Sequence, residues 1–238
     1  PMELDEVKTK YPAIECLAFP TNDYSAAYAL LIQLRDLFGK SILSAEDSLR
    51  LQSIRQAQEL SALTESGSDL SAFLKEANAE LQISFAKEPF DTRAYELVNK
   101  TNQFNLNGER YTQAEWKQRL DAPSSFLMTV SYADKYGSLG KIAVLQGRKD
   151  LNNLIINTWV MSCRAFTRHI EFKTLEVLFH TFQAERIYLE YTPTERNRPF
   201  QSFLNGVVER GLTSLGEILS TSFQQRCPSL HFNVKVSV

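Results

Sequence analysis

The sequence predicts a mixed α/β protein in two parts: a helical part over residues 1–78, and a sheet with flanking helices over residues 79–238. Three observations support this prediction. Apolar residues recur at helical spacing through most of the first part. From Leu81 onward they alternate with polar residues, which is typical of a strand. Residues 152–198 then show a strand, a helix and a second strand, and such a crossover normally joins two parallel strands.

The first part contains signals for helices and for one short strand. Asn22 or Asp23 is suited to cap a helix, because its side chain accepts hydrogen bonds from the first backbone N–H groups, and Gly39 is suited to end that helix. Pro20 ends an apolar stretch just before it. The expected elements are a strand at residues 13–19 and helices at residues 24–39, 44–64 and 68–79.

The second part alternates strands and helices. Asp91 is placed to cap one helix, and Gly137 lies in a hairpin-like connection between two strands. Residues 102–110 are expected to be a polar, asparagine-rich loop. The expected strands are at residues 81–85, 125–133, 140–147, 154–161, 186–191 and 230–238, and the expected helices at residues 92–101, 112–120, 167–182, 199–210 and 212–224.

Composition excludes several classes of function. The formal net charge of −2 gives no electrostatic reason to expect nucleic acid or a membrane surface as a partner, and no apolar run approaches the roughly 20 residues of a membrane span. Three widely spaced cysteines argue against a disulfide framework and favour a cytoplasmic setting. The three histidines show no metal-ligand spacing, so we expect no metal site.

Polar side chains follow the two strands of the central unit, at the ends where they stop. Because ligands of open α/β sheets bind at the carboxyl ends of the strands, we expect the functional site there. The residues concerned are Cys163, Arg164, Glu190, Thr194 and Asn197.

Cys163 is the sharpest candidate for chemistry. It precedes a helix and is followed by Arg164, and both features favour the nucleophilic thiolate; the alternative is a small buried residue. His169 lies near the start of that helix as a possible base, or as a surface or capping residue. The amides of Asn102, Gln103 and Asn105 suit recognition of a polar substrate or a carrier arm, whereas composition alone favours a loop whose asparagines form turns.

Several catalytic motifs are missing from these residues. The chain has no G-x-G-x-x-G, no P-loop, no G-x-S-x-G and no D-x-D-x-T motif. Dinucleotide binding, nucleotide hydrolysis, serine hydrolysis and aspartyl phosphatase chemistry therefore have no motif support.

Five motifs between about residues 95 and 200 resemble those in the carboxyl-terminal part of FkbH-like proteins. These proteins join a HAD-type phosphatase domain to a domain of the GNAT acyltransferase fold, and the helical first part resembles their connector. The matching motifs are Lys100-Thr101-Asn102-Gln103-Phe104-Asn105, Arg110-Tyr111-Thr112, Asp134-Lys135-Tyr136-Gly137, Ser162-Cys163-Arg164 and Glu190-Tyr191-Thr192-Pro193-Thr194 with Asn197.

The resemblance implies an activity. FkbH-like proteins take a three-carbon unit from 1,3-bisphosphoglycerate, dephosphorylate it and pass it as a thioester to an acyl carrier protein in polyketide-type pathways. By this resemblance Cys163 is the nucleophile that carries the glyceryl unit to the phosphopantetheine thiol, and His169 is the general base. The residues implied to bind the substrate or carrier are Asn102, Gln103, Asn105, Asp134, Arg164, Arg168, Glu190, Thr194 and Asn197.

The resemblance also implies a neighbouring domain. The HAD domain of this family ends in an Asp-Asp-Asn-Pro-x-Glu loop, and this chain begins at Pro1-Met2-Glu3. We therefore expect the chain to be the part that follows a HAD phosphatase domain, with Mg²⁺ bound only in that domain.

One departure concerns the turn before the helix. GNAT enzymes bind the pyrophosphate of acetyl-CoA on a glycine-rich turn at a helix N-terminus, and relatives often have glycine where Thr167 and His169 stand here. The glycine-free turn argues against acetyl-CoA as the donor. Two alternatives stay open: a non-catalytic module that docks the carrier protein, and an acetyl-CoA-dependent N-acetyltransferase.

Overall fold

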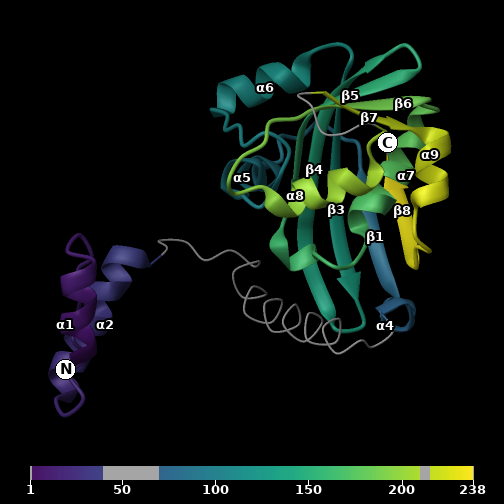
Figure 1. Ribbon diagram of the computed structural model, residues 1–238. Helices are drawn as coiled ribbons and strands as arrows, with labels where there is room; N and C mark the ends of the chain where they lie inside the picture. The colour runs from purple at the N-terminus through teal and green to yellow at the C-terminus, as the bar shows by residue number, and fades with distance from the viewer. Residues whose placement is uncertain (1, 40–69, 210–214, 238) are drawn as a thin grey trace. The chain divides into compact units, whose positions relative to one another are not determined.

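The computed structural model describes residues 2–39, 70–209 and 215–237 (Figure 1). The chain divides into two compact units, residues 1–45 and 46–238. Within the described residues, no helix is both long enough and apolar enough to cross a membrane.

The first unit contains two described helices, α1 (Met2–Lys10) and α2 (Tyr24–Phe38). The predicted cap of α2 is confirmed: Asp23 accepts a hydrogen bond from the backbone N–H of Ala26 at 2.9 Å, and the N–H of Gly39 closes the last turn. The predicted strand at residues 13–19 is wrong, since this stretch forms a turn followed by irregular chain. A strand needs a neighbouring strand for its backbone hydrogen bonds, and the described part of this unit offers helices. The helix predicted at residues 44–64 lies outside the described residues.

The second unit is built on one mixed sheet with the strand order β7-β6-β5-β4-β3-β1-β8, and a short strand β2 pairs with β5. The pairs β5–β6 and β1–β8 are parallel, and the other pairs are antiparallel. Its strands are β1 (Ala79–Ser84), β2 (Phe104–Asn105), β3 (Ser125–Asp134), β4 (Gly137–Asp150), β5 (Asn153–Met161), β6 (Arg186–Glu190), β7 (Leu215–Leu219) and β8 (Phe232–Ser237). Its helices are α4 (Leu70–Glu76), α5 (Thr92–Lys100), α6 (Gln113–Asp121), α7 (Ile170–Phe182), α8 (Arg198–Val207) and α9 (Ser220–Arg226), with a 3₁₀ turn η1 (Cys163–Ala165).

Helices cover both faces of the sheet, which confirms the predicted α/β class. On one face α7, α8 and α9 contribute Leu178, Phe200 and Phe223 to a core that includes Trp159 of β5. On the other face α5 and α6 pack with Trp116 against β3, β4 and β5. Each large apolar side chain buried in this way contributes roughly 1.5–3 kcal/mol.

The predicted strand, helix and strand of the central unit are confirmed as β5, α7 and β6, with β5 and β6 parallel. The predicted hairpin is β3–β4, where Asp134 accepts hydrogen bonds from the N–H groups of Tyr136 and Gly137.

Two stretches have a different secondary structure from the one predicted. Part of the helix expected at residues 212–224 lies outside the described residues, and from Leu215 onward the structure has strand β7 followed by helix α9. The antiparallel pairing of β7 with β6 buries Gly216 and Ile218 and overrides the helical spacing. The polar loop at residues 102–110 contains the short strand β2.

Candidate functional site

The chain leaves β5 through a sharp turn that presents Cys163. The backbone N–H of Ser162 donates to the carbonyl of Ile142 at 2.8 Å, so the turn begins fixed beside β4. Thr167 and His169 have φ values of 66° and 58°, in the left-handed region that glycine favours. These are the two positions where relatives were expected to carry glycine. Each non-glycine residue in this conformation costs of order 1 kcal/mol, and the turn keeps it without glycine.

The side chain of Cys163 is exposed, as a nucleophile must be. It lies in the 3₁₀ turn η1, directly after the carboxyl end of β5. Arg164 turns the other way: its side chain is buried, and its Nε donates to the hydroxyl of Ser162 at 3.3 Å. Of these two side chains, the thiol of Cys163 is therefore the one that a substrate can reach.

His169 is half-buried at the start of α7. Burial lowers its pKa, so the imidazole is neutral at neutral pH and is able to accept a proton. Its Nδ1 is buried without a hydrogen-bond partner in the described part of the chain, and the ring packs edge-on against Phe172. Among the described residues, no hydrogen bond joins His169 to Cys163.

The side chains of Arg168 and Asp134 make contacts within the protein. Arg168 is buried, donates to the carbonyl of Arg164 at 2.8 Å and lies over the ring of Tyr132 at 5.3 Å. The hydroxyl of Tyr132 in turn donates to Asp134 at 2.7 Å. These contacts link the turn after β5 to the end of β3, so they help to fix the turn that carries Cys163.

The parallel strands β5 and β6 separate at their carboxyl ends. Their pairing stops at Ile156 and Leu189, immediately before a bulge in β5 at Asn157. A bulge bends a strand and increases its local twist, which accounts for the separation.

The opening between the two strands is filled by the segment that begins at β2. Phe104 pairs with Met161 of β5, and the N–H of Leu106 donates to the carbonyl of Trp159 at 2.9 Å. On the other side, the N–H of Thr192 donates to the carbonyl of Leu106 at 3.2 Å. The Asn-rich motif and the chain after β6 therefore meet at the point where strand pairing ends.

Two buried amides hold this junction. Asn105 accepts hydrogen bonds from the N–H groups of Asn107 and Gly108 and donates to the carbonyl of Thr101. Asn197 donates to the carbonyls of Asn105 and Thr192, at 2.9 and 3.0 Å, and accepts from the N–H of Thr194. Both side chains are at most 2% exposed, and these bonds occupy their polar atoms. The structure thus brings Asn105, Thr194 and Asn197 together. The side-chain amides of Asn105 and Asn197 are hydrogen-bonded within the fold.

The remaining predicted residues, Asn102, Gln103 and Glu190, lie around this junction and are at least partly exposed. Asn102 accepts a hydrogen bond from Arg110 at 2.7 Å, and Gln103 is exposed. Glu190 accepts from Asn157 and, at 3.2 Å, from Arg148. Of the predicted amides, Asn102 and Gln103 are exposed beside the junction, and Asn105 is buried within it.

Glu171 is a residue of interest that the sequence did not indicate. Glu171, in the first turn of α7, has a buried Oε2 with no hydrogen-bond partner in the described residues, although the residue as a whole is partly exposed. Burial raises the pKa of Glu171 to about 7. An acidic residue early in a helix reads as ordinary dipole stabilisation, so nothing in the sequence marks this one as buried.

No group of three or more His, Cys, Asp or Glu side chains that could hold a metal ion occurs in residues 2–39, 70–209 and 215–237.

Comparisons with known proteins give only distant likenesses. No protein-family model matches this sequence, and no curated protein matches it. Among solved structures, a mutant of the spermidine N-acetyltransferase SpeG from Vibrio cholerae is 12% identical, with a TM-score of 0.40, over 62% of this chain and 98% of that one. A protein named only as an acetyltransferase, from T. thermophilus, is 14% identical, with a TM-score of 0.35, over 66% of this chain and 84% of that one.

Proposed function

We propose that this chain is an acyltransferase that passes a glyceryl or related acyl unit, held as a thioester on Cys163, to the phosphopantetheine thiol of an acyl carrier protein. The observation that carries the proposal is the exposed thiol of Cys163 at the carboxyl end of β5. The motif resemblance to FkbH-like proteins supplies the acyl unit, the carrier protein and the HAD phosphatase partner as parts of the same proposal.

The proposed chemistry has two acyl-transfer steps. The thiolate of Cys163 attacks the carbonyl carbon of an activated acyl donor, a C–S bond forms, and the donor's leaving group departs with its electron pair. The phosphopantetheine thiolate then attacks the same carbonyl, and the Cys163 thiolate leaves. Burial lowers the pKa of His169, which keeps its imidazole neutral and so able to accept the proton that the attacking thiol loses.

Intact-protein mass spectrometry tests the proposal. We expect a mass gain of one acyl unit when the chain is mixed with a glyceryl-loaded carrier protein, and loss of that mass after treatment with hydroxylamine, which cleaves thioesters. Cys163→Ala should show no gain, whereas the matched control Cys227→Ala should behave as the native chain. If the native chain gains no mass but still binds the carrier protein, the chain is a docking module and the transferase proposal is wrong.

Thiol reactivity gives a second readout. Burial raises the pKa of Cys227, and its side chain is only partly exposed, so it should react slowly. We expect iodoacetamide to modify Cys163 before Cys227, measured by peptide mass spectrometry. Modification of Cys227 first would contradict the assignment of Cys163 as the accessible nucleophile.

A further inference from the structure

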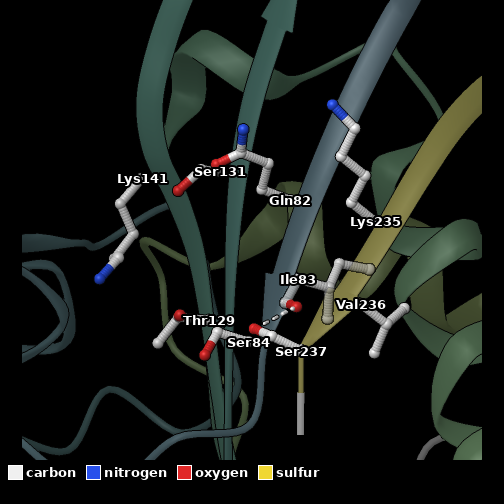
Figure 2. A pocket seen from close by; sticks show the side chains of 9 residues that line it. All are labelled: Gln82, Ile83, Ser84, Thr129, Ser131, Lys141, Lys235, Val236 and Ser237. Carbon is white, nitrogen blue, oxygen red and sulfur yellow. Dashed lines mark hydrogen bonds between the residues drawn. The ribbon is translucent and has the colours of Figure 1, made fainter.

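A second polar site lies on the sheet surface formed by β8, β1, β3 and β4, and its lining does not include Cys163 (Figure 2). It is a pocket of about 320 Å³, at the small end of the range for ligand sites. We name it the lysine-flanked pocket; it is lined by Gln82, Ile83, Ser84, Thr129, Ser131, Lys141, Lys235, Val236 and Ser237.

The strand register explains the arrangement of the pocket. Gln82 of β1 is paired with Lys235 of β8 on one side and with Ser131 of β3 on the other, and Ser131 is paired with Lys141 of β4. This makes one row across four strands, with a lysine at each end. Because paired strands lie about 4.8 Å apart, the two lysine Cα atoms are separated by about 14 Å. Figure 2 shows the two lysines on opposite flanks of the polar floor.

A second row supplies hydroxyl groups. Ser84 of β1 is paired with Ser237 of β8 and with Thr129 of β3. Together with Ser131 these residues give the lining four hydroxyls, of which that of Ser237 donates to the carbonyl of Ile83 at 3.4 Å and that of Ser84 accepts from the N–H of Ala86 at 3.2 Å. The hydroxyls of Thr129 and Ser131 hydrogen-bond to no described residue. The floor of the pocket is therefore rich in groups that both donate and accept hydrogen bonds.

The charged groups of the lining are both cations. Lys235 pairs with Glu80 at 2.7 Å and Lys141 pairs with Asp91, but neither carboxylate is part of the lining. The Lys235–Glu80 pair is exposed, so it contributes little to stability and yields readily to a competing anion. An ammonium group has three donors, so the exposed Lys235 is able to bind a ligand while it keeps its contact to Glu80.

We propose that the lysine-flanked pocket binds a short, oxygen-rich dianion that has an acidic group towards each lysine and hydroxyls over the floor. The two flanking cations select the two acidic groups, and the four hydroxyls select oxygen atoms between them. The proposal does not rest on the acyl-transfer proposal, since the lining includes neither Cys163 nor another residue of its turn.

Isothermal titration of the full chain at low salt tests this proposal with three probes. Tartrate has two carboxylates and two hydroxyls, glycerate has one carboxylate, and threitol has the carbon skeleton of tartrate without charge. We expect tartrate to bind, glycerate to bind more weakly and threitol to give no detectable heat. Binding of tartrate should weaken as salt screens the lysines.

Variants locate the site. Lys235→Gln should weaken tartrate binding about tenfold, the scale of one charge-assisted hydrogen bond, and Ser131→Ala should weaken it less. The matched control Lys149→Gln, at the far end of β4, should leave binding unchanged. Lys141→Gln is a poorer test because Lys141 also pairs with Asp91, which caps α5.

Three outcomes would overturn the proposal: no binding of tartrate, equal binding of threitol, or unchanged binding in Lys235→Gln with an unchanged melting temperature. Cys163→Ala should bind tartrate like the native chain. Loss of acyl transfer and loss of tartrate binding are therefore separable results.

Discussion

At the start of α7, two polar atoms are buried without a hydrogen-bond partner in the described residues: Nδ1 of His169 and Oε2 of Glu171. Burial favours the neutral form of each group, which lowers the pKa of His169 and raises that of Glu171. Both residues follow the turn that carries Cys163. Groups with perturbed pKa values are common at functional sites, so this helix start has a chemical role to test beyond its packing.

Replacing Glu171 should change stability in a pH-dependent way. The carboxyl has an ordinary pKa of 4.5 and a folded-state pKa of about 7, so the folded chain holds the proton more tightly. The native chain should therefore lose stability as pH rises from about 4.5 to 7 and stay at the lower level above that. Glu171→Gln should be more stable than the native chain by about 2 kcal/mol at pH 8 and nearly equal to it at pH 4.5, measured by urea unfolding.

Glu176 provides the matched control for that measurement. It lies on the same helix, its side chain is about half exposed, and it pairs with Lys173. Glu176→Gln should show no stabilisation at pH 8. Equal stability of native chain and Glu171→Gln at both pH values would mean that the carboxylate of Glu171 reaches water.

The sequence was sufficient to place Cys163 at the carboxyl end of a strand, because the apolar run of β5 and the helical spacing of α7 leave only a short turn between them. It was not sufficient to assign roles to the amides. Whether Asn105 and Asn197 face a substrate or each other depends on which distant backbone carbonyls lie nearby. The bond from Asn197 to the carbonyl of Asn105 joins residues 92 positions apart, and local sequence does not encode it.

At the scale of secondary-structure elements, β2 pairs with β5 at the place where β5 and β6 separate. It continues the sheet where these two strands separate, and it satisfies backbone groups of β5 that would otherwise need water. The side-chain amide of Asn197, just before α8, holds β2 in place by donating hydrogen bonds to the carbonyls of Asn105 and Thr192.

Removing that amide should loosen β2. Asn197→Ala deletes hydrogen bonds inside a buried site and leaves the carbonyl of Asn105 without this donor, so we expect the free energy of unfolding to fall by about 2–4 kcal/mol. Urea unfolding measures this loss. Gln103→Ala, an exposed amide two residues before Asn105, is the control and should change stability by less than about 0.5 kcal/mol. Similar losses in both variants would show that the motif as a whole, rather than the buried junction, is sensitive.

Sequence periodicity predicted the long elements and failed on two short ones. Strand β2 has two residues, too few for an alternating pattern, and strand β7 has five, of which only Gly216 and Ile218 are buried. Both strands exist because another strand offers a free edge at that place, β5 for β2 and β6 for β7. Pairing of this kind is a property of the assembled sheet.

At the scale of the whole molecule, the packed core belongs to the second unit. Every buried apolar residue in the described ranges lies between Leu74 and Phe223. Helix α2 of the first unit has no buried residue. The division at residue 78 into connector and acyltransferase domain stays a prediction, since it concerns roles as well as contacts.

Deleting residues 1–45 should therefore leave the second unit folded. Because the sheet and both of its cores lie outside the deleted part, we expect the melting temperature of the shortened chain to stay within about 4 °C of the full chain, the shift that roughly 1 kcal/mol produces at this size. Near-ultraviolet circular dichroism follows the buried tryptophans Trp116 and Trp159 directly. Trp159→Ala in the shortened chain is the control: it removes a fully buried side chain and should cost about 3–5 kcal/mol, which shows that the signal reports the core. A much lower melting temperature on deletion alone would mean that the first unit packs on the second and stabilises it, and the helical part would then be a structural support of the sheet rather than a connector.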